Sequence, residues 1–472
     1  MIDLKNLTIE KAHEGLKSGA FSCKELLDAY LAVIKEKNEN LNAFLEIFDD
    51  IVEQAEKAQN KFKEGTAEML TGIPIAIKDN ILFQGHIASA GSKILENHKA
   101  SYDSFVIKEL KKIGAVVIGR TNMDEFAMGS STQTSAYGVS RNPYDVSRVP
   151  GGSSGGSAIA VAADMALVAL GTETCGSVRE PAAFCGLVGL KPTYGAVSRN
   201  GIVAMGNSLD QVSPLSKTVR EAEIVFRVLS KYDLSDATSI KEEDRVPNKS
   251  SGNKTIGIPW GFFETGVEEE IMENFRNSID KLRNAGYEIV DLELPSLKYS
   301  LAVYYIIMPS EVSTNLSRFD GIRYGLHKGG RDVSDTYKKT RSAGFGAEAR
   351  RRIILGGYVL SEDLHGAYSK AIKVRNEITK EMEYAFKKVD FILTPTAPFL
   401  PFKIGEKMDD PVAMYLADIF SAPANLAGVP SIAVPSGFSK NSLPFSVQFT
   451  APHFCEDALF EVGKKFEEIR GE

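Results

Sequence analysis

The chain has 472 residues, of which 43% are hydrophobic, and a formal net charge of −7 at pH 7. This acidic balance disfavours a nucleic-acid-binding surface on the chain itself. No apolar run is long enough to cross a bilayer, and the first residues lack the apolar core of a signal peptide. The four cysteines fit neither a zinc spacing nor a disulfide framework, which suits a reducing compartment. We therefore expect a cytoplasmic protein without membrane contact.

The first 65 residues are predicted to form a helical lead-in that packs on the main body. Residues 22–25, Ser-Cys-Lys-Glu, are a capping box, and apolar residues follow them at helical spacing. A second helix is predicted from about Asp50 to Glu64. The remainder, residues 66–472, is predicted to form one large domain.

Beyond residue 72, strand-like and helical segments alternate along the chain. A small, apolar stretch at 157–163 predicts a buried helix that begins near Ser153, and residues 218–221 open a capped helix. Further strands are predicted at 115–119, 255–259, 287–294 and 391–395, and further helices at 271–282 and 361–388. Polar residues at about 238–254 predict a surface connection between two halves. This alternation indicates an α/β fold with a mixed central sheet that is largely covered by helices.

An apolar run of β-branched residues ends at Lys78, which predicts a buried strand that places this lysine in the interior. A buried, unpaired ammonium is costly, so such a lysine tends to become neutral. Lowering its pKa from about 10.4 to near 7 takes roughly 4 to 5 kcal/mol. A neutral lysine is a competent general base.

Two serines, Ser153 and Ser177, lie beside glycines in the segment from Val149 to Lys191. Glycine lets the backbone turn sharply and leave its N–H groups bare, as a serine nucleophile and an oxyanion site require. No histidine occurs between His98 and His327, so a lysine is the next candidate for the base. Each feature alone has an ordinary explanation, because a Gly/Ser cluster is most often a flexible loop and a lysine at a strand end is usually solvated.

Taken together and in this order, the three residues resemble the amidase signature family. The resemblance is specific and extends over nearly the whole chain; its motifs are the Gly-Gly-Ser-Ser-Gly-Gly-Ser loop at 151–157, the segment at 176–186 and Gly-Leu-Lys-Pro-Thr at 189–193. It implies that Ser177 forms the acyl ester, that Ser153 relays the proton and that Lys78 is the base. The backbone N–H groups expected to form the oxyanion hole are those of Thr174, Cys175, Gly176 and Ser177.

The C-terminal half resembles the A subunits of tRNA-dependent amidotransferases, in the segments at 315–325, 351–356, 414–419 and 423–430. These subunits are glutaminases that release ammonia for a partner, which amidates Glu-tRNA(Gln) or, in some cells, Asp-tRNA(Asn). The resemblance implies a heterotrimer with the B and C subunits. It also implies no cofactor on this chain, since ATP and Mg are used by the partner, which also binds most of the tRNA.

Free glutamine carries an α-carboxylate and an α-ammonium, so a selective site needs one fixed charge of each sign. Arg352 can bind the carboxylate with two hydrogen bonds, and Asp418 can bind the ammonium. By resemblance Tyr305, or its neighbour Tyr304, and the loop that begins at Gly129 also lie near the substrate. A lone arginine or aspartate is usually a surface or capping residue, and the tyrosines have apolar neighbours, so only the family context favours these roles.

The sequence also departs from the family pattern. Cys175 occupies the place of the first of two glycines before the nucleophile. At three further positions the residue differs from the one usual in the family: Glu173 stands where Asp is usual, Glu180 where Gln is usual, and Gln133 where Glu is usual. The tyrosine pair that is usual near His365 is absent. These changes bear on the rate and the substrate fit more than on the reaction class.

Two other functions remain open from the sequence. One is a stand-alone amidase that hydrolyses another small amide without partners. The other is a non-catalytic scaffold subunit, which an intact set of Lys78, Ser153 and Ser177 disfavours. Cys175 is not expected to be the nucleophile, because no histidine partner for a thiolate is evident.

Overall fold

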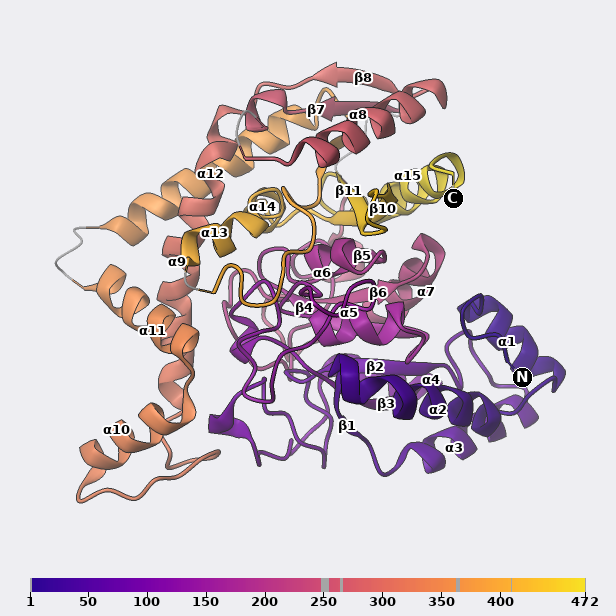
Figure 1. Cartoon of the computed structure of the whole chain (residues 1–472), viewed down its shortest axis with the longest axis vertical. Coiled ribbons are helices and arrows are strands. Elements are labelled where there is room, and N and C mark those ends of the chain that lie inside the picture. Colours follow the sequence, from indigo (N-terminus) through magenta and orange to yellow (C-terminus); the bar gives the residue numbers. More distant parts are fainter. Residues whose placement is uncertain (1, 248–253, 264–265, 362–365, 409, 472) are drawn as a thin grey trace.

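The computed structural model describes residues 2–247, 254–263, 266–361, 366–408 and 410–471. Within these residues one 11-stranded mixed sheet runs in the order β1-β3-β2-β4-β6-β5-β10-β11-β9-β7-β8. Figure 1 shows it extending from β1 near the bottom to β8 at the top. The strands are β1 (Phe44–Ile47), β2 (Pro74–Lys78), β3 (Val116–Thr121), β4 (Val168–Glu173), β5 (Val188–Lys191), β6 (Gln211–Ser216), β7 (Thr255–Ile258), β8 (Glu288–Asp291), β9 (Phe391–Pro395), β10 (Ser431–Phe438) and β11 (Pro444–Thr450).

Strand β2 lies between β3 and β4 and is parallel to both. Every residue of these three strands is buried, so both faces of this part of the sheet are covered, and their apolar, β-branched sequences fit that environment. Because parallel strands place their carboxyl ends at one edge, Lys78 at the end of β2 and the loop after Glu173 in β4 meet there. This edge holds the candidate site.

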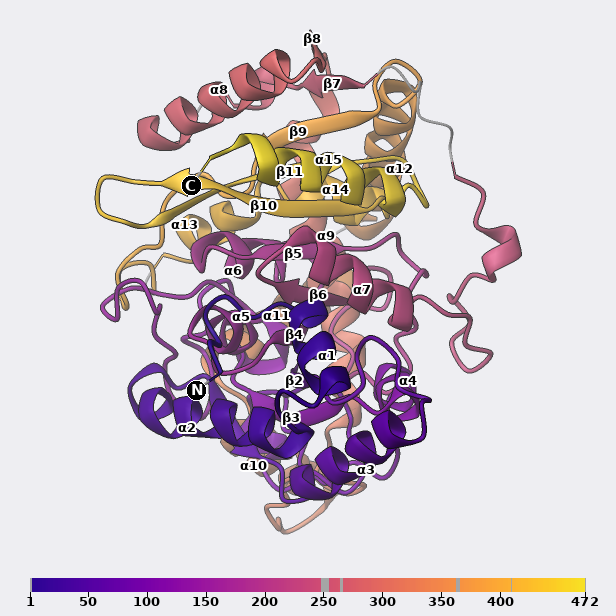
Figure 2. The ribbon, with the colours of Figure 1, turned by 90° about the vertical axis from the view of Figure 1, so that its right-hand side faces the viewer.

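Helices cover the sheet and frame this edge. Helix α5 packs against β2, β4 and β6, and α6 packs against β5, β10 and β11. The helices are α1 (Ile9–Ser18), α2 (Cys23–Leu41), α3 (Ile51–Lys63), α4 (Phe105–Ile113), α5 (Gly155–Ala162), α6 (Arg179–Phe184), α7 (Val219–Leu229), α8 (Glu269–Asn284), α9 (Ser300–Asn315), α10 (Val333–Gly344), α11 (Ala347–Leu360), α12 (Ala367–Ala385), α13 (Pro411–Tyr415), α14 (Ala422–Ala427) and α15 (Glu456–Ile469). Figure 2 shows the strands stacked along the molecule, with α7 and α15 beside them.

A group of helices, α9 to α12, lies to one side of the sheet, at the left of Figure 1. Helices α9 and α11 pack closely, because Gly356 in α11 leaves room for the backbone of α9. A β-carbon at Gly356 would lie 1.8 Å from the carbonyl oxygen of Pro309. This contact fixes α11, and with it Arg352, against the body of the protein.

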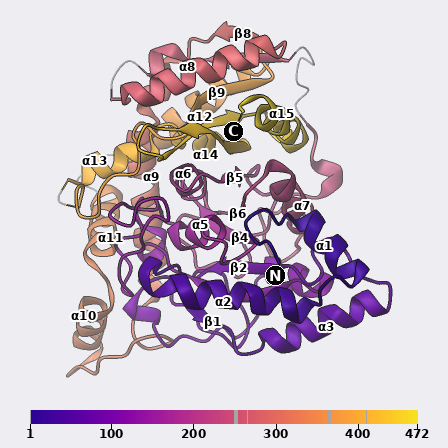
Figure 3. The ribbon, with the colours of Figure 1, turned by 45° about the vertical axis from the view of Figure 1, so that its right-hand side comes forward.

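The structure confirms the predicted α/β fold and mixed sheet, and it confirms the two capping boxes at the starts of α2 and α7. The stretch predicted to be helical also contains a strand that was not predicted, β1, which pairs with β3. Figure 3 shows α2 and α3 at this end of the sheet. The boundary near residue 65 stays a prediction. Part of the predicted polar connection, 248–253, and the position near His365 lie outside the described residues. In the part of the chain that is described, no helix is both long and apolar enough to cross a membrane.

Candidate active site

Lys78 lies fully buried at the end of β2, where its ammonium nitrogen contacts two serines. Its Nζ lies 2.7 Å from Ser153 Oγ and 2.8 Å from Ser154 Oγ. It also donates to the carbonyl oxygen of Thr172 in β4, at 3.0 Å. Ser153 and Ser154 directly precede α5, so the start of this helix holds both hydroxyls against the lysine. The predicted contact between Lys78 and Ser153 is therefore present in the structure.

Burial lowers the pKa of Lys78 to about 7, although the nearby carboxylates of Asp124, Asp210 and Glu173 oppose this shift. The positive end of α5, which starts beside Lys78, further disfavours a charged ammonium. At neutral pH a large fraction of this lysine is thus unprotonated. It can accept a proton from the Ser153 hydroxyl that it contacts.

Ser177 follows β4 in a short loop and is almost completely buried. Its carbonyl oxygen accepts a hydrogen bond from the Ser154 amide at 3.2 Å, which joins this loop to the loop of the other serines. Among the described residues, none accepts a hydrogen bond from the four amides at 174–177. Closely spaced N–H groups without acceptors beside a serine hydroxyl are what an oxyanion hole requires, and the assignment of this role to residues 174–177 stays a prediction. We refer to Lys78, Ser153, Ser154 and Ser177 as the serine–lysine cluster.

The loop conformation requires glycine at position 176. Gly176 has a φ of +77°, and a β-carbon there would lie 2.5 Å from Ser421 Oγ. Cys175, by contrast, is accommodated, with its Sγ 3.9 Å from the Asp418 carbonyl oxygen. Burial raises the pKa of the Cys175 thiol well above its ordinary value. This thiol therefore stays protonated, which agrees with its exclusion as the nucleophile.

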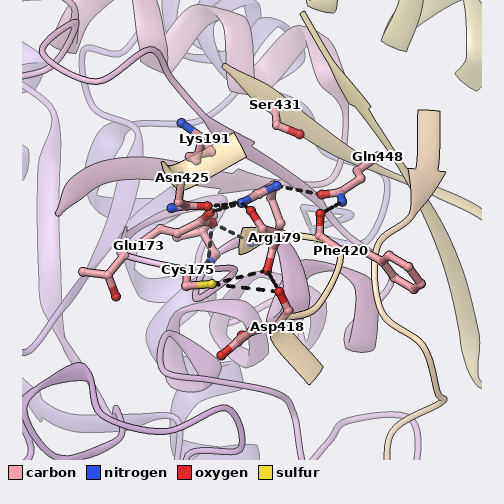
Figure 4. Close-up of polar contacts among 12 residues, drawn as sticks. Glu173, Cys175, Arg179, Lys191, Asp418, Phe420, Asn425, Ser431 and Gln448 are labelled. Atoms are coloured by element: carbon pink, nitrogen blue, oxygen red, sulfur yellow. Dashed lines mark hydrogen bonds and ion pairs between the residues drawn. The ribbon is translucent and has the colours of Figure 1, made fainter. Parts of the chain in front are cut away.

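A buried ion pair between Glu173 and Arg179 closes the base of the same loop. Burial alone would raise the pKa of Glu173, but the Arg179 guanidinium holds it below its ordinary value. Glu173 also accepts from the amides of Val178 and Arg179 at the start of α6. Arg179 extends to Gln448 and Asn425, as Figure 4 shows, so C-terminal segments anchor the nucleophile loop.

On the helical side, Asp418 lies beside the serine–lysine cluster. A β-carbon at Gly176 would lie 3.0 Å from Asp418 Oδ1, and this oxygen has no hydrogen-bond partner among the described residues. Its other oxygen accepts from Tyr305 at 3.2 Å and from Ser130 at 3.3 Å. Burial raises the pKa of Asp418 to about 7, and the Arg352 charge opposes this rise. A bound ammonium would favour the ionised carboxylate in the same way.

Arg352 is almost fully buried in α11 and donates from Nε to Glu348 at 2.7 Å. Its guanidinium carbon lies 5.6 Å from the ring centres of both Tyr305 and Tyr415, which stack on each other. Burial alone would lower the pKa of Arg352, but the neighbouring Tyr305 and Glu348 raise it above its ordinary value. This side chain is a permanent cation. We refer to Tyr305, Arg352, Tyr415 and Asp418 as the charged cluster.

A cavity of about 180 Å³ opens next to the charged cluster. Gly129, Ser131, Arg352 and Tyr415 are among its lining residues, whereas Lys78 and the two candidate serines are not. A β-carbon at Gly129 would overlap the carboxyl group of Asp124, so this loop needs glycine. The cavity is large enough for a small amino acid.

The structure thus brings Lys78 and Ser153 into direct contact, and Ser177 is joined to them through the loop backbone. The two neighbouring tyrosines have different partners: the Tyr305 hydroxyl contacts Asp418, whereas the Tyr304 hydroxyl lies 3.2 Å from the hydroxyl of Thr174. Sequence reasoning missed Ser154 as a second partner of Lys78, although it directly follows Ser153. It also missed Glu348 and Tyr415 beside Arg352, for which the i, i+4 spacing from Glu348 to Arg352 was the available signal. The contact of Lys78 with the carbonyl oxygen of Thr172 could not be predicted from residue types, because it is made by the backbone.

The fold and this site define an amidase, and the chain belongs to the amidase family, whose model matches residues 25–460. Its relatives include the A subunit of the glutamyl-tRNA(Gln) amidotransferase of Syntrophus aciditrophicus, which is 44% identical over 99% of this chain and 98% of that protein. The protein of the same name from Thermoanaerobacter pseudethanolicus is 46% identical, and the match covers 99% of this chain and 97% of that protein.

Solved structures agree with this assignment. The A subunit of the glutamyl-tRNA(Gln) amidotransferase of Thermotoga maritima superimposes with a TM-score of 0.80 at 40% identity, and covers 99% of this chain and 96% of its own. The peptide amidase of Stenotrophomonas maltophilia superimposes with a TM-score of 0.82 at 26% identity, and the match covers 100% of this chain and 98% of that one. One fold therefore serves amidases that are named for different substrates.

Proposed function

We propose that this chain is the glutaminase subunit of a tRNA-dependent amidotransferase, which hydrolyses glutamine to supply ammonia for converting Glu-tRNA(Gln) to Gln-tRNA(Gln). The observation that supports it best is the position of the charged cluster directly beside the serine–lysine cluster. The full-length similarity to proteins of that name supports it independently.

In the proposed reaction, neutral Lys78 accepts a proton from Ser153, which in turn accepts the proton of Ser177. The Ser177 oxygen attacks the amide carbon of glutamine, and the oxyanion that forms accepts hydrogen bonds from the amides at 174–177. The proton returns through Ser153 to the departing nitrogen, and ammonia leaves. Water then cleaves the acyl ester by the same route, which releases glutamate and restores Ser177.

Substrate selection follows from the two opposite charges. The Arg352 guanidinium has a face toward the cavity and binds the α-carboxylate, while Asp418 Oδ1 accepts from the α-ammonium. Tyr305 contacts Asp418 and faces Arg352, so it fixes the distance between the two charges. An amide that lacks either charge would leave a buried group unpaired, which disfavours its binding.

The remaining steps belong to partners. We propose a cytoplasmic heterotrimer with the B and C subunits, in which the partner uses ATP and Mg and binds most of the tRNA, while this chain binds no cofactor. The net charge of −7 supports this division, because tRNA binding depends on neutralising phosphates with Lys and Arg.

The experiment is to purify the chain from its native source and to ask whether two smaller subunits accompany it. The complex should form Gln-tRNA from glutamine, ATP and Glu-tRNA. The isolated chain should be weakly active and show no salt-sensitive tRNA retention on filters. Full turnover of glutamine by the isolated chain would instead favour a stand-alone amidase, and tight tRNA binding by it would contradict the division of labour.

A further inference from the structure

Residues 316–361, which include α10 and α11, differ in charge from the rest of the chain. They contain ten lysines and arginines but four aspartates and glutamates, whereas the whole chain has a net charge of −7. Asp320, Asp335 and Glu348 already form ion pairs with cations of the same segment. An excess of positive charge therefore remains, and exposed side chains such as Lys328 and Lys338 carry part of it.

The same segment exposes large apolar side chains. On α11, Ile354 is 71% exposed and Tyr358 is 55% exposed. These two residues are about one turn apart, so they project from the same side of the helix. Arg352 and Gly356, which are buried against the body of the protein, lie two residues from them and therefore on roughly the opposite side. Helix α11 thus has one face in the protein and a second apolar face in solvent.

Helix α10 repeats this pattern, with Val333 61% and Tyr337 37% exposed at the same four-residue spacing. Within the described residues, α10 packs mainly against the turn Lys93–Leu95, and α11 against α9 and α12. Figures 1 and 3 show the two helices one below the other along one margin of the molecule. A monomeric soluble protein rarely leaves a large apolar patch in water, so we expect a partner to cover this one. We refer to five exposed side chains as the α10–α11 surface: Val333, Tyr337, Lys338, Ile354 and Tyr358.

We infer that the α10–α11 surface is the docking site for the partner that receives ammonia, and that this partner meets it with an acidic surface that also carries apolar side chains. The inference rests on the proposed function and adds the interface to it. Opposite charges guide two such surfaces together and disfavour wrong partners, while the buried apolar area supplies the affinity.

Helix α11 also borders the cavity beside the charged cluster. Ala347 and Arg351, which are exposed on this helix, are among the residues that line the cavity. A partner that covers α11 therefore lies next to the proposed glutamine site. This position suits a protein that must take up ammonia before it escapes into water.

A protein fits this surface better than tRNA does. Proteins bind RNA through its phosphates and by stacking its bases on aromatic rings. The positive charge and the tyrosines could serve that purpose, but the two most exposed apolar side chains of the surface, Ile354 and Val333, are aliphatic. Aliphatic side chains leave water most favourably against other apolar side chains, as they do in the core of a protein–protein interface.

The test measures the Kd between the isolated chain and the smaller subunits that co-purify with it, by sedimentation velocity. Ile354→Asp should raise this Kd about tenfold or more, because an unpaired charge would be buried in the interface. Lys338→Glu, on the other helix, should raise it about threefold and make it less sensitive to salt. Both variants should leave KM and kcat of the isolated chain for glutamine unchanged, and circular dichroism checks their folding.

Leu234→Asp is the matched control, since Leu234 is an apolar residue that is 85% exposed outside this surface. It should leave the Kd unchanged. If neither surface variant changes the Kd while the wild-type complex forms Gln-tRNA, the inference is overturned and the proposed function stands. The inference is also overturned if the variants weaken tRNA retention by the isolated chain, or abolish its self-association, because the surface then belongs to RNA or to a second copy. If no smaller subunits co-purify, the proposed function is rejected together with the inference.

Discussion

The serine–lysine cluster and the charged cluster are built in different ways. The first lies at one edge of the sheet, where β2, β4 and the start of α5 come from the first 180 residues and every contributing strand residue is buried. The second is assembled from α9, α11, α13 and the segment after α13; these helices are far apart in the sequence, and the cluster borders a cavity. In the proposed reaction, the sheet thus holds the groups that carry out the chemistry, and the helices packed against it hold the groups that select the substrate.

The largest effect is expected from Ser177→Ala, which should abolish amide hydrolysis on every substrate. Only one hydroxyl is lost, so the fold should be kept, but removal of one member of a catalytic unit typically costs on the order of 10³-fold or more. Ammonia release from glutamine measures the loss, and circular dichroism checks the fold. Near-normal turnover by a folded variant would show that another residue is the nucleophile.

Lys78→Ala should be about as damaging as Ser177→Ala, and the double variant should be little worse than either, because residues of one unit are not additive. The wild-type rate should also depend on pH. Lys78 has a pKa of about 7 and acts as a base only when neutral. Below that pH kcat/KM should therefore fall about tenfold per unit, and above it the rate should level off. Losses that multiply in the double variant would argue against the relay through Ser153.

Arg352→Ala should show that the charged cluster selects the substrate while the serine–lysine cluster carries out the hydrolysis. It should weaken glutamine hydrolysis by about 2 to 5 kcal/mol, since a desolvated charge loses its partner, yet spare a small amide without an α-carboxylate, such as propionamide. Arg350→Ala is the control, because Arg350 lies on the same helix and is exposed, but it does not line the cavity. Equal losses on both amides would assign Arg352 a structural role.

The smallest effect is expected at Cys175, the point where the nucleophile loop touches the segment of Asp418. Cys175→Gly should lower the free energy of unfolding by about 1 to 2 kcal/mol, through lost burial and added backbone freedom. The rate with glutamine should change less than about threefold, because the oxyanion site uses main-chain N–H groups. Urea unfolding and steady-state kinetics measure the two quantities. A loss of activity larger than tenfold would mean that the thiol shapes the acyl site.

The sheet edge could be predicted because its signals are local. A β-branched run ending in Lys78, and glycines around Ser153 and Ser177, each mark a structure that nearby residues determine. The helical side was predicted less well. Helix α9 has no distinct apolar face and contains Pro309, a residue that usually marks the end of a helix, so the sequence pattern did not predict it. Contacts such as Tyr415 with Arg352 join distant segments, and no local pattern encodes them.

The order of strands in the sheet also has a consequence for synthesis on the ribosome. The hairpin of β10 and β11 joins β5 to β9, so residues 431–450 connect the two halves of the sheet. Gln448 in this hairpin, together with Asn425, accepts from Arg179 at the base of the nucleophile loop. A nascent chain holds Lys78, Ser153 and Ser177 long before those acceptors are translated. Its nucleophile loop therefore lacks these two hydrogen-bond acceptors until residues 425 and 448 have been synthesised and the hairpin of β10 and β11 has docked.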